Sequence, residues 1–240
     1  MEKNRFKFGF NAFWWEKLWD EKSITSVVEC LSRLGYQAVE YKETSFNSEG
    51  NLDNEFKRAV KISKAAGLEV SNFVILRDAA SPKEKEKTIA EVTDCIRACA
   101  SAGVNKLNLV TGAMPTTVSP DEDKWWLPKQ PVLASAWDNV FTCFEQFLKT
   151  AEKYRVYLVV EACVGQMAHD YYSTLELMQR FDAEYLALTL DPSHYLLYRN
   201  DIPRAIRQWG NKIRHVHLKD AVGRPGEFGR DFLFPILGEG

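Results

Sequence analysis

Three stretches of the chain share one pattern and decide the fold: LSRLGYQAVEY at 31–41, SKAAGLEVSNF at 63–73 and CASAGVNKLNL at 99–109. Each stretch runs from the end of a helical pattern through a glycine into a short apolar segment. The glycines, Gly35, Gly67 and Gly103, stand 32 and then 36 residues apart. Glycine is the usual residue just after a helix, because it adopts a positive φ angle without strain. The spacing is therefore that of successive strand–helix units.

The same rhythm continues along the chain and predicts seven strands separated by amphipathic helices. Alternating strands and helices imply a parallel sheet. Seven such units favour an α/β barrel of the TIM (β/α)8 type over an open doubly wound sheet. No Gly-x-Gly-x-x-Gly follows the first expected strand, so the signature of a dinucleotide-binding fold is absent. The expected strands are 5–11, 38–42, 69–76, 106–111, 156–162, 186–190 and 213–218, and the expected helices are 24–34, 55–66, 82–102, 134–154, 174–181 and 203–209.

The chain of 240 residues ends soon after the seventh expected strand. A complete barrel needs a further strand with its flanking helices, roughly 40–50 residues at this repeat length. We therefore expect a single barrel domain over residues 1–240, with the last strand and flanking helices missing from this chain. A long connection at 112–131 interrupts the rhythm and carries the pair Trp125–Trp126. Loops of about 20 residues in a compact domain are usually functional or disordered.

Composition indicates an ordinary globular protein. Hydrophobic residues make up 45% and charged residues 27% of the chain, and the formal net charge is −2. This balance shows no electrostatic footprint for nucleic acid or an anionic membrane. The five cysteines suggest no disulfide framework, which is typical of a reducing cytoplasmic compartment. We expect no membrane-spanning helix and no signal peptide, because no apolar run reaches about 18 residues and the N-terminus lacks an apolar segment.

Acidic residues and histidines stand at the ends of three consecutive expected strands. Glu161 ends LVVE, Asp191 ends LTLD with His194 three residues later, and His215 and His217 alternate in HVHLKD. In a parallel barrel, the carboxyl ends of the strands form the active-site mouth. Neighbouring strands lie about 4.8 Å apart, so such side chains can share one divalent cation. Two carboxylates and one imidazole favour Mn²⁺, Mg²⁺ or Co²⁺, with Zn²⁺ as an alternative.

Each of these residues also has an ordinary structural explanation. An acidic residue at a strand end can cap the following helix or pair with a lysine. His215 fits a packed barrel histidine better than a ligand, and His169 fits a loop position without a ligand role. Three candidate ligands at consecutive strand ends are harder to explain by chance than one.

The segments VEACVG, LTLDPSHY and HVHLKD resemble the xylose isomerase-like barrel superfamily, which contains sugar and sugar phosphate isomerases and epimerases. The resemblance covers nearly the whole chain. It implies that Glu161, Asp191 and His217 hold one divalent metal ion, with a fourth ligand on the missing eighth strand. Glu239 matches the family's loop before the last helix and is not assigned to the metal. Ala162 stands where the family usually has a polar residue, just after the glutamate of the fifth strand.

The resemblance also implies a reaction. The metal would bind a carbonyl and a neighbouring hydroxyl of an open-chain sugar and stabilise the enediolate. Glu161 would be the catalytic residue that moves the proton, and His194 would hydrogen-bond a substrate oxygen. Lys219 and Arg224 could hold a hydroxyl, carboxylate or phosphate group. Aromatic residues could wall the pocket, namely Trp14, Trp15 and Trp125.

Other functions stay open at this point. A metal-dependent dehydratase or lyase acting on a keto-sugar or inosose uses the same metal and the same enolate. Endonuclease IV, a DNA-repair enzyme of this superfamily, needs histidine ligands on early strands, whereas the first histidine here is His169. A binding module without catalysis would keep the barrel and need no metal site. The expected partner is a small carbohydrate, in a cytoplasmic protein that acts in carbohydrate metabolism, with homo-oligomer formation left open.

Overall fold

The computed structural model describes residues 6–46, 51–113, 134–224 and 232–240. The chain divides into two compact units. Unit 1 comprises Met1–Ile75, Glu91–Asn108 and Thr150–Tyr157, and unit 2 comprises Leu76–Ala90, Leu109–Lys149 and Leu158–Gly240. The prediction of a single barrel domain over residues 1–240 stays a prediction.

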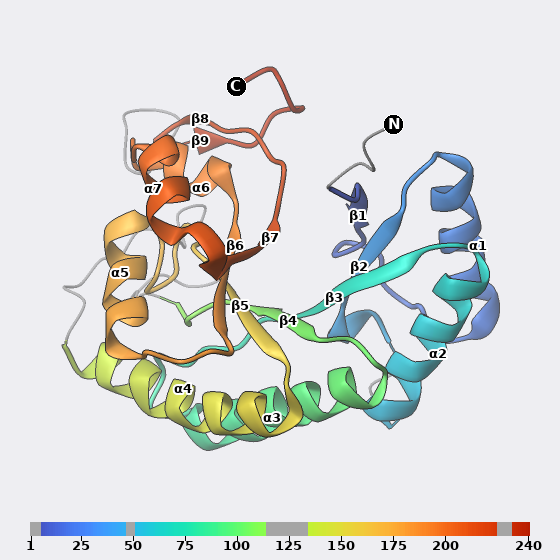
Figure 1. The fold of residues 1–240 in the computed structure, drawn as a ribbon, viewed down its shortest axis with the longest axis horizontal. Coiled ribbons are helices and arrows are strands. Elements are labelled where there is room, and N and C mark those ends of the chain that lie inside the picture. Colours follow the sequence, from blue (N-terminus) through green and yellow to red (C-terminus); the bar gives the residue numbers. More distant parts are fainter. Residues whose placement is uncertain (1–5, 47–50, 114–133, 225–231) are drawn as a thin grey trace. The chain divides into compact units, whose positions relative to one another are not determined.

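Within the described residues, seven strands form one sheet whose hydrogen-bonded order is the order of the sequence (Figure 1). These strands are β1 (Gly9–Asn11), β2 (Ala38–Lys42), β3 (Glu69–Ile75), β4 (Lys106–Leu109), β5 (Tyr157–Glu161), β6 (Leu186–Leu190) and β7 (Ile213–Val216). The pairings β1–β2 and β2–β3 in unit 1, and β5–β6 and β6–β7 in unit 2, are parallel. Sequential parallel strands with intervening helices confirm the predicted α/β fold of the TIM-barrel type.

The helices follow the predicted pattern with small differences in their bounds. They are α1 (Glu21–Arg33), α2 (Leu52–Ala65), α3 (Lys85–Ser101), α4 (Ala134–Tyr154), α5 (Tyr171–Arg180), α6 (Pro192–Leu197) and α7 (Ile202–Trp209). The bounds of α4, β2 and β6 agree with prediction to the residue, whereas β1 and β7 are shorter. Several short elements were not predicted, among them two single-turn 3-10 helices at Glu43–Ser45 and Gly210–Lys212. The others are the short helix α6 and an antiparallel pair of two-residue strands, β8 (Val222–Gly223) and β9 (Phe232–Leu233).

Unit 1 shows why the repeated glycines follow the helices. Gly35, Gly67 and Gly103 adopt φ angles of 85°, 83° and 75° after α1, α2 and α3. After α1, the Gly35 N–H donates to the Ser32 carbonyl at 3.0 Å, and the Tyr36 N–H donates to the Leu31 carbonyl at 3.1 Å. The same pair of bonds recurs after α2 and α3. This Schellman motif satisfies carbonyls of the last helical turn, so the predicted helix ends are confirmed.

The core of unit 1 is aromatic. The rings of Phe56 and Phe73 stack with centroids 3.5 Å apart, and Tyr41 and Phe46 pack beside Phe73. The Tyr41 hydroxyl shares a hydrogen bond of 2.9 Å with Ser63 Oγ, and burial raises the pKa of Tyr41 to about 12. The helices α1 and α2 lie side by side, and α2 packs on β3 (Figure 1). Burial of these aromatic rings packs α2 against β2 and β3.

In unit 2, β5 and β6 are buried strands of almost entirely apolar sequence, as parallel strands covered on both faces require. Glu161 pairs in register with Thr189 of β6, and Leu188 pairs with Ile213 of β7. The carboxyl ends of β5, β6 and β7 therefore lie side by side. Each end is followed by one of the polar segments singled out in the sequence.

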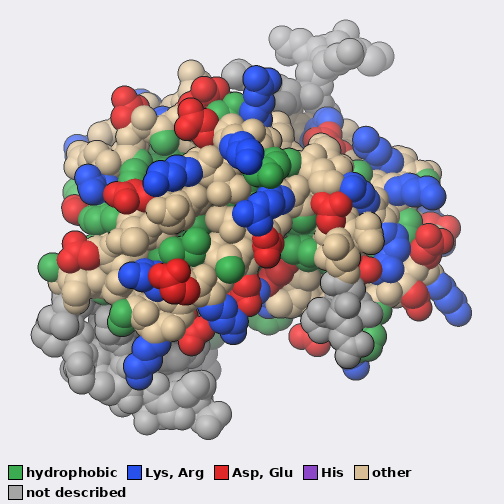
Figure 2. Space-filling view, turned by 90° about the horizontal axis from the view of Figure 1, so that it is seen from below, with side chains coloured by type: hydrophobic (Ala, Val, Ile, Leu, Met, Phe, Trp, Pro, Cys, Tyr) green, Lys and Arg blue, Asp and Glu red, His purple; other side chains and the backbone are tan. Residues whose placement is uncertain are grey.

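The surface carries charges of both signs. On the face drawn in Figure 2, Lys and Arg side chains are interspersed with Asp and Glu side chains and do not gather into a patch of one sign. In the part of the chain that the structure describes, helices with the length and apolar character needed to cross a bilayer are absent.

Gly112, just after β4, is held in a crowded turn of unit 2. Its φ angle is 99°, and a Cβ atom there would lie 2.6 Å from the backbone nitrogens of Ala79 and Ala80. The carboxylate of Asp78 accepts hydrogen bonds from the N–H groups of Ala80, at 3.1 Å, and Ala113, at 3.2 Å. Burial raises the pKa of Asp78. Only glycine fits this approach of one backbone to another.

We expect the substitution Gly112→Ala to lower the free energy of unfolding by about 3 kcal/mol or more, because it adds a steric clash to backbone strain. The matched control is Gly35→Ala, which has a similar φ angle of 85° but no atom within 4 Å of the added Cβ. Strain alone should cost the control about 1 kcal/mol. Urea unfolding followed by circular dichroism measures the free energy of unfolding of both variants. Equal losses would show that steric crowding at Gly112 adds nothing to the backbone strain.

Candidate metal centre

The structure brings the predicted ligands together in unit 2. Glu161 ends β5, Asp191 follows β6 and His217 follows β7. Glu161 Oε1 lies 3.1 Å from His217 Nδ1. One ligating atom each of Glu161, Asp191 and His194 lie within 4.8 Å of one another. Glu161 and His217 are largely buried, with side chains 13% and 14% exposed. Glu161 thus lies close to both other predicted ligands, and its group with Asp191 also contains His194, the predicted substrate-binding residue.

The two carboxylate oxygens of Asp191 have different surroundings. Oδ1 accepts hydrogen bonds from Ser193 N at 2.9 Å and Ser193 Oγ at 2.6 Å, which caps the first turn of α6. Oδ2 is buried and has no hydrogen-bond partner among the described residues. Its neighbours are Lys219 Nζ at 3.3 Å and His194 Nε2 at 3.5 Å. Burying this anionic oxygen without a hydrogen bond is costly, and the Lys219 ammonium offsets part of that cost. The grouped carboxylate and imidazole donors also fit a divalent metal ion.

His194 is oriented by the loop that follows β5. The Val164 N–H donates to His194 Nδ1 at 3.2 Å. A neutral imidazole that accepts at Nδ1 carries its proton on Nε2. This N–H faces the cluster, since Nε2 lies 3.5 Å from Asp191 Oδ2 and 3.9 Å from Glu161 Oε1. Burial lowers the pKa of His194, although the Asp191 carboxylate opposes this shift. The net lowering favours the neutral ring.

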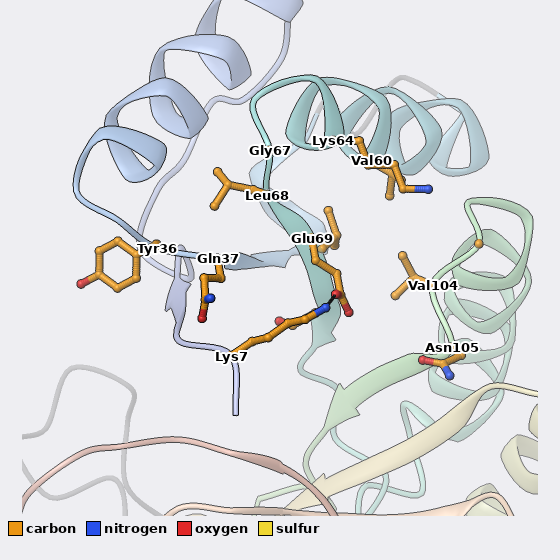
Figure 3. Close-up of a pocket in the computed structure, with 13 residues that line it drawn as sticks. Lys7, Tyr36, Gln37, Val60, Lys64, Gly67, Leu68, Glu69, Val104 and Asn105 are labelled. Atoms are coloured by element: carbon orange, nitrogen blue, oxygen red, sulfur yellow. Dashed lines mark hydrogen bonds and ion pairs between the residues drawn. The ribbon is translucent and has the colours of Figure 1, made fainter. Parts of the chain in front are cut away.

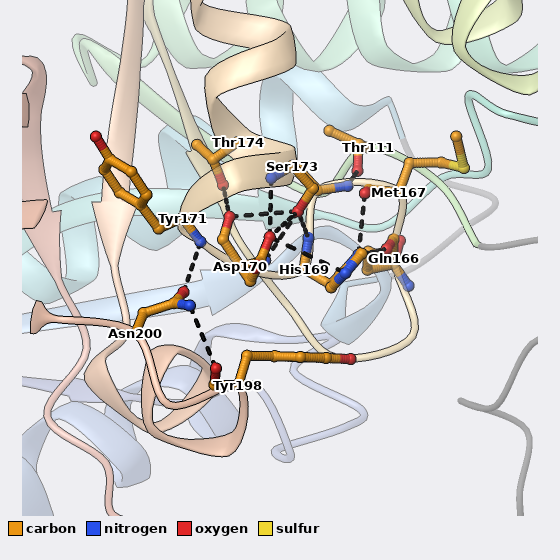
Figure 4. Close-up of polar contacts among 11 residues, drawn as sticks. Thr111, Gln166, Met167, His169, Asp170, Tyr171, Ser173, Thr174, Tyr198 and Asn200 are labelled. Carbon is orange, nitrogen blue, oxygen red and sulfur yellow. Dashed lines mark hydrogen bonds and ion pairs between the residues drawn. The ribbon is translucent and has the colours of Figure 1, made fainter. Parts of the chain in front are cut away.

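A polar network fixes the loop between β5 and α5 (Figure 4). The Ala168 N–H donates to Thr111 Oγ1 at 2.8 Å. Asp170 caps α5 by accepting the Ser173 N–H at 2.8 Å, while the Ser173 hydroxyl lies 3.0 Å from the Asp170 nitrogen. His169 Nδ1 lies 3.1 Å from two backbone carbonyl oxygens of this loop. The network holds the loop that carries Val164, and His169 takes part in it as a loop residue.

Two predicted substrate-binding residues lie near or after β7. Lys219 Nζ lies 3.2 Å from His194 Nε2 and 3.8 Å from the centroid of the Phe234 ring. Arg224 is partly exposed and follows β8. Sequence reasoning missed Phe234, whose ring is also 5.4 Å from that of His194. The only signal for it is the apolar run after the segment 225–231, and that run does not indicate a neighbour.

The tryptophans predicted to wall the pocket have other surroundings. Trp14 and Trp15 belong to unit 1. Trp14 is 86% exposed, and Trp15 stacks on Phe10 with ring centroids 5.0 Å apart. Trp125 lies outside the described residues. Substrate binding by these three residues therefore stays a prediction.

A cavity of about 680 Å³ lies in unit 1, at the amino ends of β2, β3 and β4 (Figure 3). An ion pair between Lys7 and Glu69 crosses it, and Gln37, Lys64 and Asn105 contribute to its wall. Lys7 and Glu69 neutralise each other's charge. Since TIM-barrel active sites form at the carboxyl ends of strands, this cavity is not the candidate site.

The fold is that of an α/β barrel protein, and the candidate site lies at the carboxyl ends of its strands, where barrels of this type carry their active sites. The chain belongs to the xylose isomerase-like TIM barrel family, whose model matches residues 28–240. This confirms the family resemblance noted in the sequence. No curated protein is detectably similar to the chain in sequence.

Solved structures are similar in fold at low sequence identity. A xylose isomerase domain protein from Planctomyces limnophilus is 16% identical, with a TM-score of 0.68, over 88% of this chain and 76% of its own. D-allulose 3-epimerase from Methylomonas sp. is 14% identical, with a TM-score of 0.69, over 90% and 72%. The probable 3-DHS dehydratase AsbF from Bacillus anthracis is 18% identical, with a TM-score of 0.69, over 89% and 73%. At these identities the likeness shows the fold alone.

We expect Asp170→Ala to lower the free energy of unfolding by about 1–2 kcal/mol, because the first turn of α5 loses its capping acceptor. Asp170→Asn keeps a capping oxygen and should lose clearly less. Denaturant unfolding of the two variants measures the difference. Equal destabilisation by alanine and asparagine would show that the cap does not hold the loop.

Proposed function

We propose that the protein is a divalent-metal-dependent sugar or sugar phosphate isomerase or epimerase that transfers a proton next to a carbonyl group. The observation that carries the proposal is Asp191 Oδ2, which is buried without a hydrogen bond beside Glu161 and His194. Fold likeness to proteins named D-allulose 3-epimerase and L-ribulose 3-epimerase supports the reaction type.

Glu161, Asp191 and His217 would hold the ion, and their oxygen and nitrogen donors suit Mn²⁺, Mg²⁺ or Co²⁺, with Zn²⁺ as an alternative. When bound, such an ion supplies Lewis-acid stabilisation of charge on a carbonyl oxygen. His194 stays outside the ligand set, since its Nδ1 is occupied by the Val164 N–H and its Nε2 carries the proton. The N–H of His194 would donate to a substrate oxygen.

The chain's own residues would then act on the substrate in defined roles. Glu161 accepts the proton from the carbon next to the carbonyl, and its largely buried carboxylate keeps bulk water from competing. His194 donates its Nε2 proton in a hydrogen bond that fixes a substrate oxygen. Lys219 and Arg224 supply positive charge for a hydroxyl, carboxylate or phosphate group. Trp14, Trp15 and Trp125 are proposed to pack against the apolar face of the sugar.

A dehydratase acting on a keto-sugar or keto-inositol is the second candidate. Fold likeness to the probable 3-DHS dehydratase and to mannonate dehydratase favours it. Both reactions begin with removal of the same proton and differ in whether the enolate regains a proton or expels hydroxide. A panel of ketoses and keto-inositols in D₂O with Mn²⁺ separates them, because an epimerase incorporates deuterium and a dehydratase yields an unsaturated product.

We expect Glu161→Gln to abolish exchange of the substrate α-proton with solvent deuterium, a loss of about 10²-fold or more, since the amide cannot accept a proton. Proton NMR of the substrate in D₂O measures the exchange. The control Glu145→Gln removes a carboxylate of unit 2 that pairs with Arg180 on the surface, and it should exchange at the parental rate. Parental exchange by Glu161→Gln would refute the proposed base.

Mn²⁺ should raise the melting temperature of the protein, and EDTA should reverse the rise. At about 100 times the Kd the ion adds about 2.7 kcal/mol to the stability. Asp191→Asn and His217→Ala should lose most of this gain, whereas His194→Ala should keep it. Differential scanning fluorimetry across a Mn²⁺ titration measures all four proteins. If Mn²⁺ stabilises His217→Ala but not His194→Ala, then His194 rather than His217 is the metal ligand.

A further inference from the structure

An ammonium group is built into the candidate metal centre. Lys219 Nζ lies 3.3 Å from Asp191 Oδ2, the carboxylate oxygen without a hydrogen bond. It also lies 3.2 Å from His194 Nε2 and 3.8 Å from the centroid of the Phe234 ring. The lysine thus places its positive charge next to the oxygen that would coordinate the proposed metal ion.

The contact with His194 does not hold the ammonium there. His194 Nδ1 accepts the Val164 N–H, so Nε2 carries a proton and has no lone pair for Lys219. Two donors face each other in this contact. The attractive contacts of the ammonium are the carboxylate of Asp191 and the face of the Phe234 ring, which binds cations through its quadrupole.

Phe234 is itself fixed on both sides along the chain. Before it, β9 pairs with β8, and Phe232 packs against Val164, Leu197 and Ala221. After it, the Asp220 carboxylate accepts the N–H groups of Gly238 at 2.9 Å and Gly240 at 3.0 Å. These contacts hold the segment 232–240 beside the site and keep the ring under the ammonium.

We propose that Lys219, positioned by Phe234, is an internal cation that competes with the divalent metal ion for Asp191. The inference rests on the proposed metal-dependent function. Glu161 and Asp191 carry two negative charges, and Lys219 cancels one of them. A divalent ion is attracted less strongly to the remaining charge, so Lys219 weakens metal binding and makes the metal readily exchangeable. It also leaves a positive charge in the loaded site to face an anionic oxygen of the substrate.

Lys219→Met tests the competition without reference to catalysis. Free Mn²⁺, followed by its electron paramagnetic resonance signal, gives the Kd of each variant at low ionic strength. We expect Lys219→Met to bind Mn²⁺ about tenfold tighter or more, because the competing charge is gone. Phe234→Leu should bind more tightly by a smaller factor, since the ammonium is no longer held. The double variant should equal Lys219→Met, because Phe234 acts through the lysine.

Two controls keep the result interpretable. Lys219→Arg retains the charge and should stay near the parental Kd, and Lys149→Met removes an exposed lysine of α4 and should change nothing. If Lys219→Met does not fold, Lys219→Gln and Phe234→Leu carry the same test. An unchanged or weaker affinity in the variants without Lys219 overturns the inference and leaves the metal site standing. Failure of every variant and of the parent to bind Mn²⁺ overturns both.

Discussion

The carboxylate of Asp191 is the point on which the site depends. One oxygen is satisfied twice by Ser193 and begins α6, and the other is buried without a hydrogen bond. Burying an anionic oxygen is unfavourable by several kcal/mol unless a cation lies close. Among the residues that the structure describes, Lys219 supplies a cation 3.3 Å from this oxygen, and the proposed metal ion would be a second. The side chain cannot rotate to relieve the burial, because its first oxygen caps the helix.

The fold provides this constraint through parallel register and fixed loops. Buried apolar strands place the ends of β5, β6 and β7 next to one another, so that Glu161, Asp191 and His217 follow neighbouring strands. The loop after β5 is held by Thr111 and by the cap at Asp170, and it turns His194 by donating one backbone N–H. Hydrogen bonds between backbone and side chains, together with the contact between Glu161 and His217, therefore set the geometry of the cluster.

Much of this arrangement could be predicted from the sequence because it follows local rules. The glycines at 35, 67 and 103 mark helix ends, and the polar residues that end apolar strands mark the carboxyl edge of the sheet. Other features depend on long-range contacts. Nothing in the run around Phe234 indicates that its ring lies under Lys219, and α6 has too few residues for a helical period, although the Asp191–Pro192 start was a signal for it. The sequence leaves capping and metal binding as alternatives for Asp191, whereas in the structure Oδ1 caps α6 and Oδ2 has no hydrogen bond.

We propose above all that Asp191 Oδ2, the oxygen without a hydrogen bond, belongs to a divalent metal site shared with Glu161 and His217. Anomalous diffraction from crystals of the protein soaked in Mn²⁺ tests it most directly. We expect one strong anomalous peak in unit 2, with Asp191 Oδ2, a Glu161 oxygen and a His217 nitrogen about 2.0–2.3 Å from it. A peak bound by other residues, or an ordered Asp191 with no ion beside Oδ2 at saturating Mn²⁺, would contradict the account.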